Sequence, residues 1–239
     1  MFRVRCVWLS GPALLILTFG LYAQGTKNPA KQPPAKQAWR EAFAADKANL
    51  VDTGRNTYFI LEPGYRLTFG HGKDTLVVTV LDETKVVDGV KTRIIEERET
   101  SGGQLAEVSR NFFAIDKTTN DVYYFGEDVD EYKNGKVTGH EGSWLAGVNG
   151  ARFGLMMPAN PKTGDRYYQE LAPKVAMDRA EIISVTETAK VPAGTYNNVL
   201  HTRESSAVES GSEDKWYAPD VGLIKDAEFV LAKIEKGKK

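Results

Sequence analysis

The three histidines of this chain, His71, His140 and His201, are its best candidates for acid–base or metal chemistry. His71 stands between two glycines, which predicts a turn. Glu141 directly follows His140, but adjacent residues of a strand point to opposite faces, and metal ligands recur at i and i+2 on a strand or i and i+4 on a helix. We therefore predict no metal site. A hydrolase that uses His140 and Glu141 is kept as one alternative function.

Four carboxylates gather near the middle of the chain, at Glu127, Asp128, Asp130 and Glu131. Oxygen ligands are what calcium requires, but this spacing does not match an EF-hand loop. A solvated acidic turn is the preferred interpretation, and calcium binding is left open. The sequence also contains no G-x-S-x-G motif for a serine nucleophile. No catalytic residue and no cofactor are predicted.

The N-terminus has the pattern of an export signal. Arg3 and Arg5 precede an apolar stretch over residues 13–21, and Ala23 offers a small residue for cleavage. We predict a signal peptide over residues 1–23 and a periplasmic or secreted protein, in preference to an uncleaved membrane anchor. Cys6, the single cysteine, lies inside this segment, so the exported chain would carry neither a disulfide nor a thiol nucleophile.

The charge balance argues against a polyanionic partner. Removing Arg3 and Arg5 would lower the basic residues from 31 to 29, against 32 acidic ones, for a net charge of −3. Nucleic-acid binding needs a basic surface, so no nucleic acid is expected, nor stable membrane insertion after cleavage. The expected partners are a lipid-like or other apolar small molecule, or an envelope protein.

The segment over residues 24–38 is rich in Pro, Lys and Gln and predicts a linker. Trp39 and Phe43 then begin an apolar pattern with helical spacing, which predicts a short helix over residues 38–50. We expect a single β domain over residues 39–239.

Beyond Asp52, runs rich in Val, Ile, Thr, Tyr and Phe alternate with turn signals, and no helical pattern separates them. Asp88-Gly89 and Asn134-Gly135 each predict a two-residue hairpin, because a type I′ turn needs positive φ at both central positions. The fold class is therefore all-β: an antiparallel curved sheet or barrel-like meander, with a short N-terminal helix. The predicted strands are Thr57–Leu61, Tyr65–Phe69, Thr75–Leu81, Lys91–Glu99, Ala106–Ile115, Val122–Glu127, Arg166–Leu171, Arg179–Thr188, Asn198–Glu204, Asp214–Ala218, Leu223–Asp226 and Phe229–Ile234.

The chain repeats a pattern at a nearly constant distance. Glu83 and Glu187 are 104 positions apart, and Arg98 and Arg203 are 105 apart. This offset predicts two related halves, about residues 57–127 and 157–235. The alternative is two segments that merely share a composition.

Arg98 and Arg203 hold equivalent places in this repeat, on strands that also carry apolar residues such as Ile94. If Arg98 shares an inward face with Ile94, its guanidinium could bind an anionic ligand or pair with a carboxylate. We assign both arginines as candidate ligand-binding residues. An exposed strand charge or a structural salt bridge is the simpler alternative.

The Gly-rich segment over residues 128–153 interrupts the strands. Together with Trp144, which lies within it, Tyr124, Met156 and Met157 are assigned as candidate ligand-binding residues, since aromatic and Met side chains suit an apolar ligand and equally suit a core. We expect Trp144 to be partly exposed near an open end of the sheet and Trp216 to be buried. The alternative is that the segment covers a sheet edge.

The stretch W-Y-A-P-D-V-G-L-I-K, from Trp216 to Lys225, resembles a motif of uncharacterised exported bacterial β proteins. The hairpin signal V-P-A-G-T-Y, from Val191 to Tyr196, and the segment from Tyr123 to Tyr132 are similar to the same proteins. The wider resemblance is to periplasmic β domains of the lipoprotein-carrier (LolA-like) kind, whose curved antiparallel sheet cups an apolar space. The resemblance implies a turn around Pro219 and names no catalytic residue.

We therefore expect an exported, non-enzymatic binding or carrier module for an apolar or amphiphilic envelope component. One alternative is a structural or interaction β scaffold of the cell envelope, in which the two halves simply pack together. The other is the carboxylate/histidine hydrolase named above.

Overall fold

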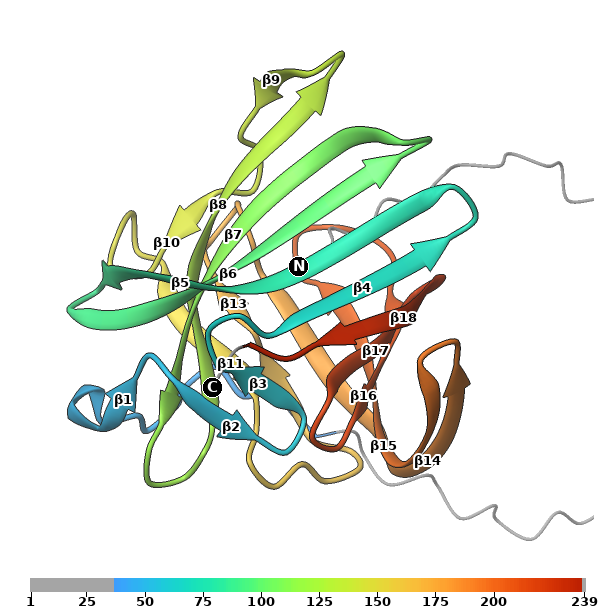
Figure 1. Cartoon of the computed structure of the whole chain (residues 1–239). Coiled ribbons are helices and arrows are strands. Elements are labelled where there is room, and N and C mark those ends of the chain that lie inside the picture. Colours follow the sequence, from blue (N-terminus) through green and yellow to red (C-terminus); the bar gives the residue numbers. More distant parts are fainter. Residues whose placement is uncertain (1–36, 238–239) are drawn as a thin grey trace, which may run out of the picture.

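The computed structural model describes residues 37–237, so the predicted signal peptide and nearly all of the predicted linker lie outside the described residues. A 16-stranded antiparallel sheet dominates the molecule and curves into a nearly closed barrel (Figure 1). The all-β, barrel-like prediction is confirmed. Within residues 37–237, no helix is both long and apolar enough to span a bilayer.

Two antiparallel meanders form the barrel wall, and the first and last of their strands, β4 and β18, pair with each other (Figure 1). The first meander comprises β4 (Arg66–His71), β5 (Asp74–Val87), β6 (Val90–Ser101), β7 (Gln104–Asp116) and β8 (Val122–Lys133). The second comprises β14 (Asp178–Val191), β15 (Gly194–Ser206), β16 (Glu213–Ala218), β17 (Gly222–Asp226) and β18 (Phe229–Glu235).

Three short strands bring the remaining edges of the sheet together. β11 (Arg152–Met157) pairs with β8, and β13 (Glu170–Leu171) pairs with β11. β12 (Arg166–Tyr168) pairs with β14 on the opposite edge. Because only Gln169 separates β12 from β13, these strands place the two edges next to each other and leave the barrel almost closed.

A separate hairpin of β2 (Gly54–Asn56) and β3 (Phe59–Leu61) lies at one end of the barrel, which we call the hairpin end (Figure 1). The Asn56 amide donates to the carbonyls of Asn120 and Pro158, and the Tyr58 hydroxyl donates to the carbonyl of Asn198. These bonds tie the hairpin to both meanders. The turns β4–β5, β6–β7 and β17–β18 lie at the opposite end, the far end.

The local sequence signals correspond closely to the strands. Asp88 and Gly89, and likewise Asn134 and Gly135, all have positive φ, as a type I′ hairpin requires. The turn from Pro219 to Val221 joins β16 to β17, as the motif implied. Each predicted strand falls on a strand of the structure, several of which are longer than predicted. The internal repeat stays a prediction.

The predicted helix over residues 38–50 is not confirmed. This stretch is irregular apart from one 3-10 turn, η1 (Lys47–Asn49), which leads into β1 (Leu50–Val51). Arg40 bridges to Tyr167 through backbone hydrogen bonds, and the Trp39 ring lies 4.0 Å from the Arg166 guanidinium. These tertiary contacts hold the chain extended and override its helical spacing.

The Gly-rich central segment covers one edge of β8. β9 (Lys136–Gly139), β10 (Trp144–Leu145) and β11 pair with successive parts of this strand, which β7 borders on its other side. None of these three short strands was predicted. Their pairing agrees with the edge-covering alternative, because a covered edge cannot template pairing with another chain.

Candidate functional site

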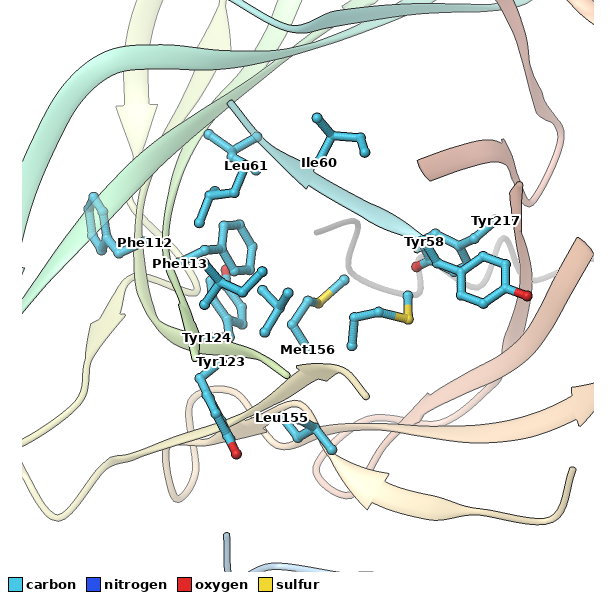
Figure 2. Packing of buried hydrophobic residues seen from close by; sticks show 14 of the residues in the cluster. Tyr58, Ile60, Leu61, Phe112, Phe113, Tyr123, Tyr124, Leu155, Met156 and Tyr217 are labelled. Carbon is cyan, nitrogen blue, oxygen red and sulfur yellow. The ribbon is translucent and has the colours of Figure 1, made fainter. Parts of the chain in front are cut away.

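The barrel interior contains a cavity of about 70 Å³ beside the β2–β3 hairpin. Its wall is mostly apolar and comes from both meanders. Figure 2 shows Phe113 and Tyr124 lying together on one side of the cluster, with Tyr58 and Tyr217 on the other and Met156 between them. The principal wall residues are Tyr58, Leu67, Val80, Ile95, Phe113 and Tyr217.

The cavity is small and borders the surface beside β17. Engineered cavities that bind benzene are about 150 Å³, roughly twice this volume. The cavity therefore suits a few water molecules or a short apolar chain. Val221 and Leu223 on the β17 side are only half-buried. β17 pairs with β18 at just two positions, Lys225 with Val230 and Asp226 with Phe229. The two strands therefore diverge toward the hairpin end, and we call the interval between them the seam.

Charged side chains line the part of the cavity that faces the far end. Lys215, Asp226 and Glu97 all contribute to the lining. The Lys215 ammonium lies 3.3 Å from Asp226 Oδ2, 3.3 Å from Glu204 Oε2 and 3.7 Å from Glu213 Oε1. We call Lys215, Glu204, Glu213 and Asp226 the Lys215 cluster. It places a buried cation among three carboxyl groups inside a β-barrel.

The Lys215 cluster perturbs the pKa values of its members. Burial lowers the pKa of Lys215, but Asp226, Glu204 and Glu213 outweigh burial and raise it well above its usual value. Burial raises the pKa of Glu213 to about 7, against the opposing effect of Lys215. Burial also raises the pKa of Asp226. The Lys215 ammonium therefore keeps some, but not all, of these carboxyl groups ionised.

The hydrogen bonds of the cluster are incomplete. Glu204 Oε1 accepts bonds from Gln169, Thr202 and Tyr217. Within residues 37–237, Asp226 Oδ1 is buried and accepts no hydrogen bond, whereas Glu204 Oε2 has its ion pair with Lys215. Buried polar atoms are nearly always paired in folded proteins, so Asp226 Oδ1 calls for a particular explanation.

A second group of carboxyls faces the interior nearer the far end. Glu127 and Glu170 are buried beside Asp178. Burial raises the pKa of Glu127 to about 7 and the pKa of Glu170 well above its usual value, and neighbouring carboxylates add to both effects. Glu99 and Glu107 line the interior close by. The inner surface thus changes from apolar at the hairpin end to acidic toward the far end.

The structure places Arg98 and Arg203 on the outer face of the barrel. Their side chains are 47% and 49% exposed, and they pair with Glu96 at 3.7 Å and with Asp214 at 3.1 Å. Side chains alternate between faces along a strand, so their neighbours Glu97 and Glu204 point inward instead. The inward guanidinium considered for Arg98 is therefore not found, and both arginines agree with the simpler alternative of an exposed strand charge in a salt bridge. Their ligand-binding role stays a prediction, and neither lines the cavity.

The remaining candidates divide between cavity and core. Met156 lines the cavity, whereas Met157 is buried in the core. Tyr124 stacks on Phe113 with ring centroids 4.6 Å apart and donates a hydrogen bond to Asn111. Tyr124 therefore supports a cavity wall without lining it.

The expectation that Trp144 is partly exposed is wrong, since only 6% of its surface is accessible. Gly126 explains this burial: a Cβ there would lie 2.3 Å from the Trp144 carbonyl oxygen, so the missing side chain lets β10 dock closely on β8. The indole packs edge-on against Tyr124, with centroids 5.5 Å apart. Gly126 therefore serves close packing. Trp144 also borders a groove of about 250 Å³ at the segment's surface.

The expectation that Trp216 is buried is also wrong, because it lies half-buried on the outer face. Its ring stacks on His201 with centroids 4.4 Å apart, and its indole N–H donates to Glu187 over 3.0 Å. The two ring nitrogens of His201 lie 2.9 Å from Glu187 and 3.0 Å from Asp214. We call Glu187, His201, Asp214 and Trp216 the His201 cluster. Each ring nitrogen in it has a carboxylate partner.

The other residues considered for catalysis or metal binding do not converge. The His140 side chain is 66% exposed and lies 3.1 Å from Asp130, on the strand that precedes it. Glu127 faces the interior, whereas Asp128, one residue on, is exposed, so the central carboxylates are split between two faces. Among residues 37–237, no group of three or more His, Cys, Asp or Glu side chains is arranged to hold a metal ion.

Sequence reasoning missed the Lys215 cluster. One signal was present: Lys215 stands two positions before Tyr217, which places both side chains on one face of a strand. A lysine in phase with a buried aromatic residue indicates an inward charge. The aromatic pair Trp216-Tyr217 did not reveal which of its two members faces inward.

No family model matches this chain, and no curated protein matches it either. Among solved structures, the crystal structure of a "putative lipoprotein" from Parabacteroides distasonis ATCC 8503 is similar, with 12% sequence identity and a TM-score of 0.37. The match covers 77% of this chain and 100% of that chain. A likeness at this level supports no conclusion about function.

Proposed function

We propose that this protein is an exported, non-enzymatic binding or carrier module that takes an apolar or amphiphilic molecule into its barrel. The observation that carries the proposal is the apolar cavity formed by both meanders and the β2–β3 hairpin. Small-molecule sites are typically concave and mostly apolar, with few polar groups, and this cavity has that character. Export, to the periplasm or outside the cell, rests on the N-terminal sequence pattern.

The cavity volume limits what can bind. At about 70 Å³ it accepts a short apolar chain or the end of a longer one, but not a whole lipid. A longer chain would leave along the seam between β17 and β18, where Val221 and Leu223 are half-buried. The ligand is therefore expected to be small, or to be held by one end.

Native mass spectrometry of protein purified gently from its own envelope provides the first test. A retained small-molecule mass supports the binding module. Titration of the isotope-labelled protein with 1-hexanol, followed by NMR, provides the second. We expect saturable shifts of backbone amides around the cavity, at Val80, Ile95 and Tyr217.

A matched pair of variants on β5 locates the binding. Val80→Trp fills the cavity, whereas Val86→Trp adds the same side chain at an exposed position of the same strand. We expect Val80→Trp to abolish the hexanol shifts and Val86→Trp to preserve them. If Val80→Trp does not fold, Leu223→Phe fills the half-buried seam side of the cavity instead.

A protein with no retained mass and no saturable shifts would overturn the proposal. That outcome favours the structural or interaction scaffold, in which the two meanders only pack together. Shifts that persist in both filling variants would move the binding elsewhere, and the groove at Trp144 would then be the next place to examine.

A further inference from the structure

The Lys215 cluster contains more acid than base. One ammonium contacts the carboxyl groups of Glu204, Glu213 and Asp226, and Glu97 lines the same cavity. A buried charge is tolerated only when it is paired and hydrogen-bonded. A single lysine cannot neutralise Glu204, Glu213 and Asp226 if all three ionise. The excess of acid means that a second positive charge would be stabilised at this place.

Asp226 lines the cavity and holds a buried acceptor that the described residues do not use. Its side chain is only 3% exposed and lines the cavity, and Oδ1 accepts no hydrogen bond from residues 37–237, whereas Oδ2 contacts Lys215. Glu204 Oε2, in contrast, already lies 3.3 Å from the Lys215 ammonium. Leaving a buried acceptor without a partner destabilises the folded protein, and more so when the group is charged. A donor that entered the cavity would remove this cost.

From these contacts we propose that the ligand is a primary amine: its ammonium group binds at Asp226 and Glu97, and its short apolar chain lies against the wall at Val80 and Phe113. This inference rests on the proposed function and specifies the class of ligand for the same cavity. A primary ammonium has three donors and a positive charge. It therefore satisfies Asp226 Oδ1 and balances the acid that Lys215 leaves over.

Other head groups fit the cavity less well. A carboxylate or phosphate would meet the carboxyls of Asp226 and Glu97, while the contacts of Lys215 are already taken up by three acids. A hydroxyl could donate one hydrogen bond to Asp226 but would add no charge. The ligand expected in the cavity is thus cationic, opposite in sign to the anionic ligand that the outward Arg98 and Arg203 would attract.

Isothermal titration calorimetry with three six-carbon probes tests the inference at neutral pH. These are hexylammonium, 1-hexanol and hexanoate, which share a chain and differ in head group. We expect hexylammonium to bind about tenfold or more tightly than hexanol, since a charge-assisted hydrogen bond contributes about 1.5–3 kcal/mol. Hexanoate should bind most weakly.

Matched carboxyl variants assign the ammonium site. Asp226→Asn removes the proposed partner, and Asp82→Asn makes the same change at a side chain that is 93% exposed. We expect Asp226→Asn to reduce hexylammonium affinity to that of hexanol while hexanol affinity holds, and Asp82→Asn to change neither. If Asp226→Asn does not fold, Glu97→Gln replaces the other lining carboxyl.

The outcomes separate this inference from the proposed function. Equal binding of hexylammonium and hexanol would overturn the amine inference and leave the apolar binding module standing. Tight hexylammonium binding that survives both Asp226→Asn and Glu97→Gln would also overturn it. Failure of all three probes to bind at the cavity would contradict the proposed function itself.

Discussion

The Lys215 cluster and the His201 cluster lie back to back across β15 and β16. His201 and Asp214 face outward, whereas Glu204 and Lys215, their near neighbours in the chain, face inward. Both clusters combine carboxylates with a basic group at distances of about 3 Å. They differ in how completely their hydrogen bonds are satisfied.

A structural role accounts for all the contacts described in the outer cluster. Each ring nitrogen of His201 has a carboxylate partner, and the indole N–H of Trp216 donates to Glu187. In the described part of the chain, the inner cluster leaves Asp226 Oδ1 without a donor, and Glu204 Oε2 has only its ion pair with Lys215. Buried ion pairs contribute little net stability even when satisfied. The difference teaches that incomplete hydrogen bonding, rather than the mere presence of charged residues, marks the place where a bound ligand would stabilise the protein.

The largest expected effect of a single substitution comes from removing the buried cation. Lys215→Met leaves three carboxyl groups without their shared partner, so we expect a loss of about 3–5 kcal/mol in the free energy of unfolding. Lys225→Met makes the same change on the outer face, where the ammonium lies 4.2 Å from the Trp216 ring, and should cost less than about 1 kcal/mol. Urea denaturation measures both. Equal losses of stability in the two variants would contradict the distinction between the inner and outer clusters.

The pH dependence of stability should come from the interior acids. Folding raises the pKa of Glu213 and of Glu127 from 4.5 to about 7, so between these values the folded protein binds more protons than the unfolded chain. By linkage, each of these two groups should add roughly 2.5 kcal/mol to stability as pH falls from about 8 to about 5, which is roughly 5 kcal/mol for the pair. Glu213→Gln should flatten part of this rise. Stability that instead fell over this range would mean that the interior acids are ionised and well paired.

The outer face should respond weakly to loss of charge. Arg203→Ala breaks a half-exposed pair with Asp214, and Arg98→Ala breaks one with Glu96. Each should cost about 0.2–1 kcal/mol, because solvent screens exposed ion pairs. Thermal unfolding at low and high salt checks this. A loss of several kcal/mol for Arg203→Ala would show that the His201 cluster holds the wall together.

The smallest expected effect is a difference in fluorescence quenching between two tryptophans, and it involves no change in the stability of the protein. In variants that retain one of them as the single tryptophan, acrylamide should quench Trp216 more strongly than Trp144. Trp216 is half-buried on the outer face, whereas Trp144, on β10, is buried against Tyr124. The reverse order would contradict the assignment of inner and outer faces around both residues.

The strands could be predicted from sequence because their signals are local. Asp88-Gly89 and Asn134-Gly135 determine turns without reference to the rest of the chain. The inward or outward direction of each charge could not be predicted in this way. Strand alternation shows which side chains share a face, but not which of the two faces is the inner one. Ile95 and Glu97 line the cavity, so Arg98 points outward, and Lys215 and Tyr217 line it, so Trp216 between them points outward.

The pairing of β18 with β4 also bears on how the chain reaches this structure. It joins residues near the two ends of the described chain, such as Leu67 with Ile234. Contacts so distant in sequence form slowly, because a long loop must be ordered before they stabilise anything. Until they form, β4 presents an open edge that can pair with another chain. The last strand thus protects the growing molecule from aggregation, and the interval before it docks is the most vulnerable stage of folding.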